Sequence, residues 1–227
     1  MVSCHQKSNI MTEPTETKTY TLETARCLLR PWQDDDAHEL FLYASDPRVG
    51  PPAGWAPHKT EEESLSIIRG ILAQPYTFAV VLKETGKPVG SVGLMIGKRS
   101  HGDLPDQEAE IGYWIGVPYW GQGLIPEAVR RLEQFAFDEL GMNILWCGYF
   151  DGNEKSRRVQ EKCGFTYHHT IPVVELPQLG ETRMEHISIL RRDEYYGITP
   201  RPSILPLLQA AFYILFLIML FFYYVKG

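Results

Sequence analysis

The glycine turn within residues 119 to 141, YWGQGLIPEAVRRLEQFAFDELG, constrains the fold more than any other stretch of the chain. Two glycines one residue apart run directly into an amphipathic helix. Such a turn exposes backbone N–H groups at the positive end of the helix dipole, where anions and phosphates bind. Glycine before a helix is also ordinary turn chemistry. The turn alone therefore leaves a phosphate site and a plain connection both open.

Short runs rich in β-branched and aromatic residues alternate with helical periodicity through the middle of the sequence. This alternation predicts a mixed α/β domain over residues 21–196. We expect strands near residues 26–32, 76–83, 89–97, 109–117, 144–150, 164–174 and 183–195. Helices are expected near residues 33–45, from residue 60, over 123–141 and over 153–163. The aspartate run 34–36 is predicted to cap the first helix.

Composition excludes several classes of protein. The 227 residues carry a formal net charge of -6 and a sequence pI near 5.7, which argues against a nucleic-acid-binding protein. The cysteines are scattered without paired spacing, so neither a zinc site nor a disulfide framework is predicted. They are Cys4, Cys27, Cys147 and Cys163. Adjacent His168 and His169 are expected on opposite faces of a strand and therefore not on one metal.

The two ends of the chain differ sharply. Residues 1–20 are polar and aperiodic, which predicts a disordered arm. Residues 197–206 form a proline-rich linker to an apolar run, 207–225, that spans about 28 Å as a helix at about 1.5 Å per residue. This layout indicates membrane association through a C-terminal transmembrane helix, with the domain facing the cytosol. The alternatives are an apolar helix packed on the domain or in an oligomer, or a chance apolar extension, and each would leave a soluble cytoplasmic protein.

Taken together, residues 109 to 165 carry a resemblance. The order AEIGYWIGVPYWGQGLIPEAVRRL, followed by NEKSRRVQEKCGF, resembles the GNAT superfamily of acetyl-CoA-dependent N-acetyltransferases, and within it the ribosomal-protein N-terminal acetyltransferase group. The likeness covers roughly residues 22–195. It implies a central mixed sheet of about six to seven strands with a splayed central pair, flanked by about four helices. The apolar run would add a C-terminal hydrophobic helix.

The resemblance also implies a set of residues for the co-substrate acetyl-CoA, and no metal. Backbone groups of Ile115 and Val117 would pair with the pantetheine arm as an added strand does. The glycine turn would hold the pyrophosphate, and Asn153 would help to hold the pantetheine arm. The turn residues are Trp120, Gly121, Gln122, Gly123 and Leu124, with Ile125 standing where the family prefers a smaller side chain.

The implied reaction moves an acetyl group to an amine by direct transfer in a ternary complex, and the amine must lose a proton before it attacks. Glu110 is the predicted general base, with Glu108 on the same strand face as the alternative. Ser156 would stabilise the leaving thiolate, because Gln160 stands where many family members have a tyrosine. The acceptor could be a protein N-terminus, a polyamine or another small amine.

A second function stays open. Ile125 and the apolar tail would also suit a membrane-tethered acyl-CoA-binding module without catalysis. A kinase or NTPase is excluded, because the glycine turn lacks the Lys and Ser or Thr that such phosphate loops need. Trp32, Trp114 and Trp146 are expected to pack in the core, and Trp55 in its proline-rich loop is the one tryptophan worth testing for contact with a ligand.

Overall fold

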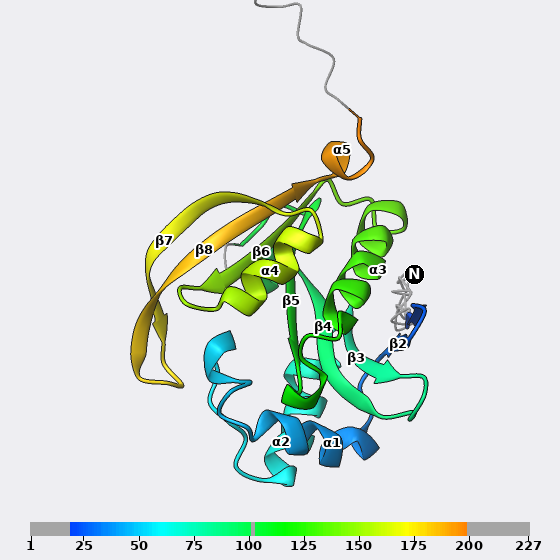
Figure 1. Cartoon of the computed structure of the whole chain (residues 1–227), viewed down its shortest axis with the longest axis vertical. Helices are drawn as coiled ribbons and strands as arrows, with labels where there is room; N and C mark the ends of the chain where they lie inside the picture. The colour runs from blue at the N-terminus through cyan, green and yellow to red at the C-terminus, as the bar shows by residue number, and fades with distance from the viewer. Residues whose placement is uncertain (1–18, 101–102, 199–227) are drawn as a thin grey trace, which may run out of the picture.

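A computed structural model describes residues 19–100 and 103–198, with eight strands and five α-helices among them (Figure 1). The strands form one sheet in the order β1-β2-β3-β4-β5-β6-β8-β7. All neighbours are antiparallel except β5 and β6. The strands are β1 (Leu22–Glu23), β2 (Cys27–Arg30), β3 (Thr77–Leu82), β4 (Pro88–Ile96), β5 (Glu108–Ile115), β6 (Ile144–Phe150), β7 (Thr166–Leu176) and β8 (Glu181–Arg191). The mixed α/β fold is therefore confirmed, with the two-residue β1 raising the strand number above the six to seven predicted.

Two of the helices begin with a side-chain cap, whereas the longest helix begins at a glycine. Thr60 and Asn153 accept hydrogen bonds from the backbone N–H groups of Glu63 and Ser156, whereas Gly123 caps the longest helix without a side chain. Asp36, in the aspartate run predicted to cap the first helix, makes no side-chain cap hydrogen bond to that helix. Its carboxylate accepts from the Gln33 N–H at 2.9 Å and from the Arg30 guanidinium at 2.7 and 2.8 Å. The helices are α1 (Ala37–Ala44), α2 (Glu61–Arg69), α3 (Leu124–Asp138), α4 (Glu154–Lys162) and α5 (Arg192–Tyr195).

The core lies on both faces of the sheet. Along β3, Phe78 and Val80 belong to one buried cluster and Ala79 and Val81 to another, as expected when successive side chains point to opposite faces. The first cluster contains the inner side of α3 and the end of α4, and the second contains α1 and α2. Figure 1 shows α1 and α2 at the lower end of the sheet, away from α3 and α4.

The sheet splits between β5 and β6. These strands pair in parallel only from Glu108 opposite Ile144 to Glu110 opposite Trp146. Beyond that point β5 continues along β4 to Ile115, and β6 continues along β8 to Phe150. The splayed central pair that the resemblance implied is thus present.

Two local predictions were wrong. The last strand was expected to run to residue 195 but ends at Arg191, whose N–H donates to the Glu194 carboxylate at 3.2 Å and starts α5. His168 and His169 do not point to opposite faces: the register shifts between Tyr167 and His169, and the two Nδ1 atoms lie 2.8 Å apart. A β-bulge places consecutive side chains on one side in this way. No group of three metal-ligating side chains occurs among the described residues.

The predictions for the chain ends fall mostly outside the described residues. Of the arm 1–20 only Thr19 and Tyr20 are described, and the Tyr20 ring packs edge-on against Phe135 at 4.8 Å between centroids. The linker 197–206 is described only at its first two residues, and the predicted span 207–225 lies wholly outside. Within the described ranges no helix is both long and apolar enough to cross a bilayer.

Candidate active site

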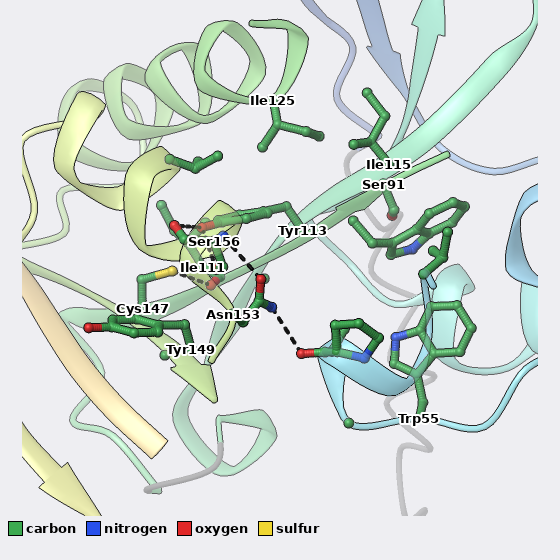
Figure 2. Close-up of a pocket in the computed structure, with 18 of the residues that line it drawn as sticks. Trp55, Ser91, Ile111, Tyr113, Ile115, Ile125, Cys147, Tyr149, Asn153 and Ser156 are labelled. Atoms are coloured by element: carbon green, nitrogen blue, oxygen red, sulfur yellow. Dashed lines mark hydrogen bonds between the residues drawn. The ribbon is translucent and has the colours of Figure 1, made fainter. Parts of the chain in front are cut away.

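A cleft of about 1730 Å³ lies at the split in the sheet (Figure 2). It is lined by β5, by the glycine turn and the start of α4, and by the loop that follows α1. Small-molecule sites usually occupy about 300–1,000 Å³. The cleft therefore has room for a long, extended ligand together with a second molecule.

The free edge of β5 faces this cleft. The Gly116 N–H donates to the Val89 carbonyl of β4 at 2.8 Å, so by the alternation of an antiparallel ladder the backbone groups of Tyr113 and Ile115 point the other way, into the split. Of the two residues predicted here, Ile115 has its carbonyl bonded to the Trp120 indole N–H at 3.0 Å. The Val117 carbonyl accepts from the Trp120 backbone N–H at 3.1 Å. The Ile115 N–H faces the split by the same alternation, and the Val117 N–H donates to no backbone carbonyl among the described residues.

The predicted glycine turn has the geometry of an anion site. Gly121 and Gly123 have φ values of +76° and +77°, which favour glycine over any residue with a Cβ. The backbone N–H groups over residues 121–125 have no hydrogen-bond partner within the described part of the chain. They lie at the positive end of α3, so the turn can bind a phosphate. Leu124 and Ile125 are buried in the core at 3% and 4% exposure.

Two basic residues that the sequence did not single out lie at this turn. The Arg26 guanidinium donates to the Gln122 carbonyl at 2.9 Å and pairs with Glu127 at 2.7 Å. The Lys155 ammonium lies 3.3 Å from the centre of the Trp120 ring, in a cation–π contact. Both bring positive charge to a place predicted to hold a pyrophosphate. Arg26 lies 96 residues from Gln122 in sequence, so no local pattern could have indicated it.

The start of α4 is tied to the split by side chains. Asn153 accepts from the Ser156 N–H at 3.2 Å and donates to the Pro52 carbonyl at 3.0 Å. Figure 2 shows the Tyr113 ring reaching from β5 towards Ser156, where the two hydroxyl oxygens are 2.9 Å apart. The structure thus brings the predicted Asn153 and Ser156 together and adds Tyr113, which the sequence presented only as a strand residue.

Gln160 and the cysteines beside it are buried. Gln160 is 2% exposed and donates to the Gly148 carbonyl at 3.0 Å, while its Oε1 has no partner within the described residues. Burial raises the pKa of the Cys147 thiol well above its usual value and that of Cys163 to about 12. Both thiols are therefore protonated at neutral pH and poor nucleophiles.

Glu110 lies on the opposite face of β5 from Tyr113 and lines the cleft. The alternative base Glu108 accepts a hydrogen bond of 2.6 Å from the Trp146 indole and does not line the cleft. A second carboxylate on this face was not predicted: Glu185 of β8 is 9% exposed, and a Cβ on Gly148 would overlap its carboxyl group. Gly148 thus gives the Glu185 side chain room to lie over β6.

Comparison with known proteins identifies the family. A family model described as an acetyltransferase (GNAT) domain matches residues 26–166, more than half of the chain. The chain belongs to the GNAT acetyltransferase family. It is an N-acetyltransferase by this membership and by its relatives, among them the uncharacterized N-acetyltransferase p20 of Bacillus licheniformis. The two are 31% identical over 128 residues, or 54% of this chain and 69% of p20.

Solved structures of acetyltransferases share the fold of this acetyltransferase. A candidate ribosomal-protein-serine acetyltransferase from Vibrio cholerae matches with a TM-score of 0.62 and 25% identity, over 76% of this chain and 97% of that one. The microcin C7 self-immunity acetyltransferase MccE, solved in complex with acetyl-CoA and AMP, matches with a TM-score of 0.58 and 20% identity, over 74% and 93%.

Aromatic rings form one wall of the acetyltransferase cleft on the Glu110 face. The Trp114 ring lies 6.1 Å from both Trp32, nearly parallel, and Trp55, nearly perpendicular. Trp55 is held against Gly50, where a Cβ would overlap its ring. Trp55 lines the cleft, as do Trp114 and Trp120, while Trp32 is buried at 8% exposure and does not.

Proposed function

We propose that the protein transfers the acetyl group of acetyl-CoA directly to an amine, with both substrates bound at once. The observation that carries this proposal is the cleft at the split of β5 and β6, with the glycine turn and Tyr113 on one side and Glu110 on the other. The presence of acetyl-CoA in the fold relative MccE supports the choice of donor.

In this proposal the donor binds on the side of α3 and α4. The pyrophosphate lies at the N–H groups of Gly121, Gln122, Gly123, Leu124 and Ile125, and Trp120 shapes the turn beside it. The pantetheine arm runs along the free edge of β5 and bonds to the N–H groups of Ile115 and Val117. It passes Asn153, and its thioester sulfur comes to Ser156. The Val117 N–H then polarises the thioester carbonyl.

The acceptor enters from the face that carries Glu110. An aliphatic amine reaches the cleft mostly as an ammonium ion, and the carboxylates Glu110 and Glu185 on that face attract a cation. Glu110 takes the amine proton, directly or through water, and the neutral nitrogen attacks the thioester carbon. Protein N-termini, polyamines and other small amines all satisfy this chemistry, and the likeness to a candidate ribosomal-protein-serine acetyltransferase favours a protein acceptor.

Direct transfer is favoured over an acetyl-cysteine intermediate. Cys147 is the cysteine that lines the cleft among the described residues. It is 2% exposed, and its thiol donates to the Ile111 carbonyl at 3.3 Å. Since burial raises the pKa of this thiol, the thiolate that covalent catalysis needs is scarce.

Replacing Glu110 with Gln tests the assignment of the base. We expect turnover of the full chain to fall about 100-fold or more, with the Kd for acetyl-CoA changed less than about twofold, because the carboxylate acts only on the amine proton. Free-thiol release over a panel of peptides and small amines measures turnover, and calorimetry measures the Kd. Glu108→Gln is the matched control, and a loss confined to Glu108→Gln would transfer the role of base to Glu108.

A non-catalytic acyl-CoA-binding module is the alternative function. Tight binding of acetyl-CoA by the full chain, with no release of CoA across the whole amine panel, would favour it over the acetyltransferase.

We further propose that the apolar run 207–225 attaches the protein to a membrane, with the catalytic domain in the cytosol.

A further inference from the structure

The Ser156 hydroxyl needs a fixed orientation to serve the transfer reaction, an inference that rests on the proposed function. When the thioester breaks, negative charge develops on sulfur, and a hydrogen-bond donor aimed there stabilises the transition state. A serine hydroxyl is a freely turning donor unless another group fixes its hydrogen. Ser156 lines the cleft at the start of α4, and Asn153 holds its backbone N–H at 3.2 Å. The backbone is thus fixed while the hydroxyl keeps its freedom to turn.

Tyr113 provides the missing constraint. Its hydroxyl oxygen lies 2.9 Å from the Ser156 Oγ and 3.1 Å from the Ser156 carbonyl oxygen. A phenol carries one hydrogen and therefore donates to only one of these acceptors at a time. The two oxygens of one residue thus offer Tyr113 two alternative hydrogen-bond arrangements without any movement of the backbone.

Tyr113 keeps its hydrogen in both arrangements. Burial raises the pKa of the Tyr113 phenol well above that of a free tyrosine, with the nearby Cys147 adding to the rise. Hydrogen bonds to Ser156 and Gln160 oppose it. The phenol is therefore neutral across the physiological range and acts through its O–H bond, without giving up a proton.

We propose that Tyr113 is a positioning residue that turns the Ser156 hydroxyl towards the departing sulfur. At rest, Tyr113 donates to the Ser156 carbonyl and accepts from the Ser156 O–H. As the C–N bond forms and the C–S bond breaks, the electron pair of the C–S bond moves to sulfur. The Ser156 O–H then turns to donate to sulfur, and the Tyr113 O–H turns to donate to Ser156 Oγ. Glu110 receives the amine proton, and the thiolate is later protonated by water.

A double-mutant cycle with the full chain tests this assignment. We expect Tyr113→Phe and Ser156→Ala each to lower kcat about tenfold, with KM for acetyl-CoA changed less than about twofold. The double variant should have the kcat of Ser156→Ala alone, because Tyr113 acts only through the hydroxyl that Ser156→Ala removes. A further tenfold loss in the double variant, or no effect of Tyr113→Phe in the unmodified chain, would overturn the proposal.

The cycle separates positioning from a merely structural role. Ser156→Ala leaves the Ser156 carbonyl in place. If Tyr113 served only to hold α4 against β5 through that carbonyl, the double variant would have a lower kcat than Ser156→Ala alone. Tyr167→Phe is the matched control, since Tyr167 is 63% exposed and its hydroxyl bonds to Thr170 outside the cleft. Thermal melting confirms that each variant folds. If the unmodified chain releases no CoA, the proposed acetyltransferase function is wrong. If it releases CoA but the cycle gives the contrary result, only the role of Tyr113 is wrong.

Discussion

At the scale of single residues, Glu133 is the clearest case of a side chain whose state is set by its surroundings. It lies on the inner side of α3 at 1% exposure, and its Oε1 has no hydrogen-bond partner within the described part of the chain. Burial raises the pKa of Glu133 to about 8, while the charge of Arg130 opposes the rise. The carboxyl is therefore mostly protonated in the folded protein at neutral pH.

Replacing Glu133 with Gln should remove a pH dependence from the free energy of unfolding. The stability linked to Glu133 is fully present below its ordinary pKa of 4.5 and is lost as pH rises through about 8. Between these two pKa values the Glu133 carboxyl is ionised in the unfolded chain but protonated in the folded protein. The free energy of unfolding therefore falls by up to about 1.4 kcal/mol per pH unit as the pH rises. Denaturant unfolding across this range should show the slope in the unmodified chain and not in Glu133→Gln. The exposed control Glu139→Gln should keep it, and an unchanged slope in Glu133→Gln would contradict the assignment.

At the scale of elements, α3 is bounded by glycines of one conformation. Gly121 in the turn before it has φ +76°, and Gly141 after it has φ +68°. A Cβ at either position would meet nothing within 4 Å. Only Gly121 lines the cleft. Substitutions at the two glycines therefore separate the loss of stability caused by the left-handed backbone from the loss of phosphate binding.

Gly121→Ala and Gly141→Ala should each lower the free energy of unfolding by about 1–2 kcal/mol, since a left-handed conformation disfavours any residue with a Cβ. Only Gly121→Ala should weaken acetyl-CoA binding, by about tenfold, because its methyl group stands where phosphate oxygens approach the N–H groups. Calorimetry at a temperature where both variants are folded measures the difference. Equal weakening in both would attribute the effect to stability alone.

The elements were predictable where the signal is local. Alternating side chains and the glycine turn placed β5, α3 and β6 correctly, because each depends on residues close in sequence. The start of α5, the bulge at His168 and the arrival of Arg26 at the turn were missed. Each is decided by hydrogen bonds or by a register that the rest of the sheet imposes. Tyr113 was missed because the alternation pattern gives its face but not the helix that covers it.

At the scale of the whole molecule, the apolar run 207–225 makes a prediction about the chain in cells. A helix of this length matches the hydrocarbon core of a bilayer, about 30 Å thick. The full-length protein should therefore stay with membranes through an alkaline carbonate wash, whereas a chain ending at Tyr196 should not. Immunoblotting of the washed fractions measures this. Full-length protein in the wash would show that the run does not span a membrane.

The split between β5 and β6 has a consequence for the size of the acceptor. Under the proposed function, acetyl transfer takes place through the opening, so the bulk of each substrate stays on its own side of the sheet. The acceptor then needs only a slender amine that can reach the gap, whatever is attached behind it. A metabolite and the end of a folded protein would present the same few atoms to Glu110, and the rims of the two faces, not the transfer point, would decide between them.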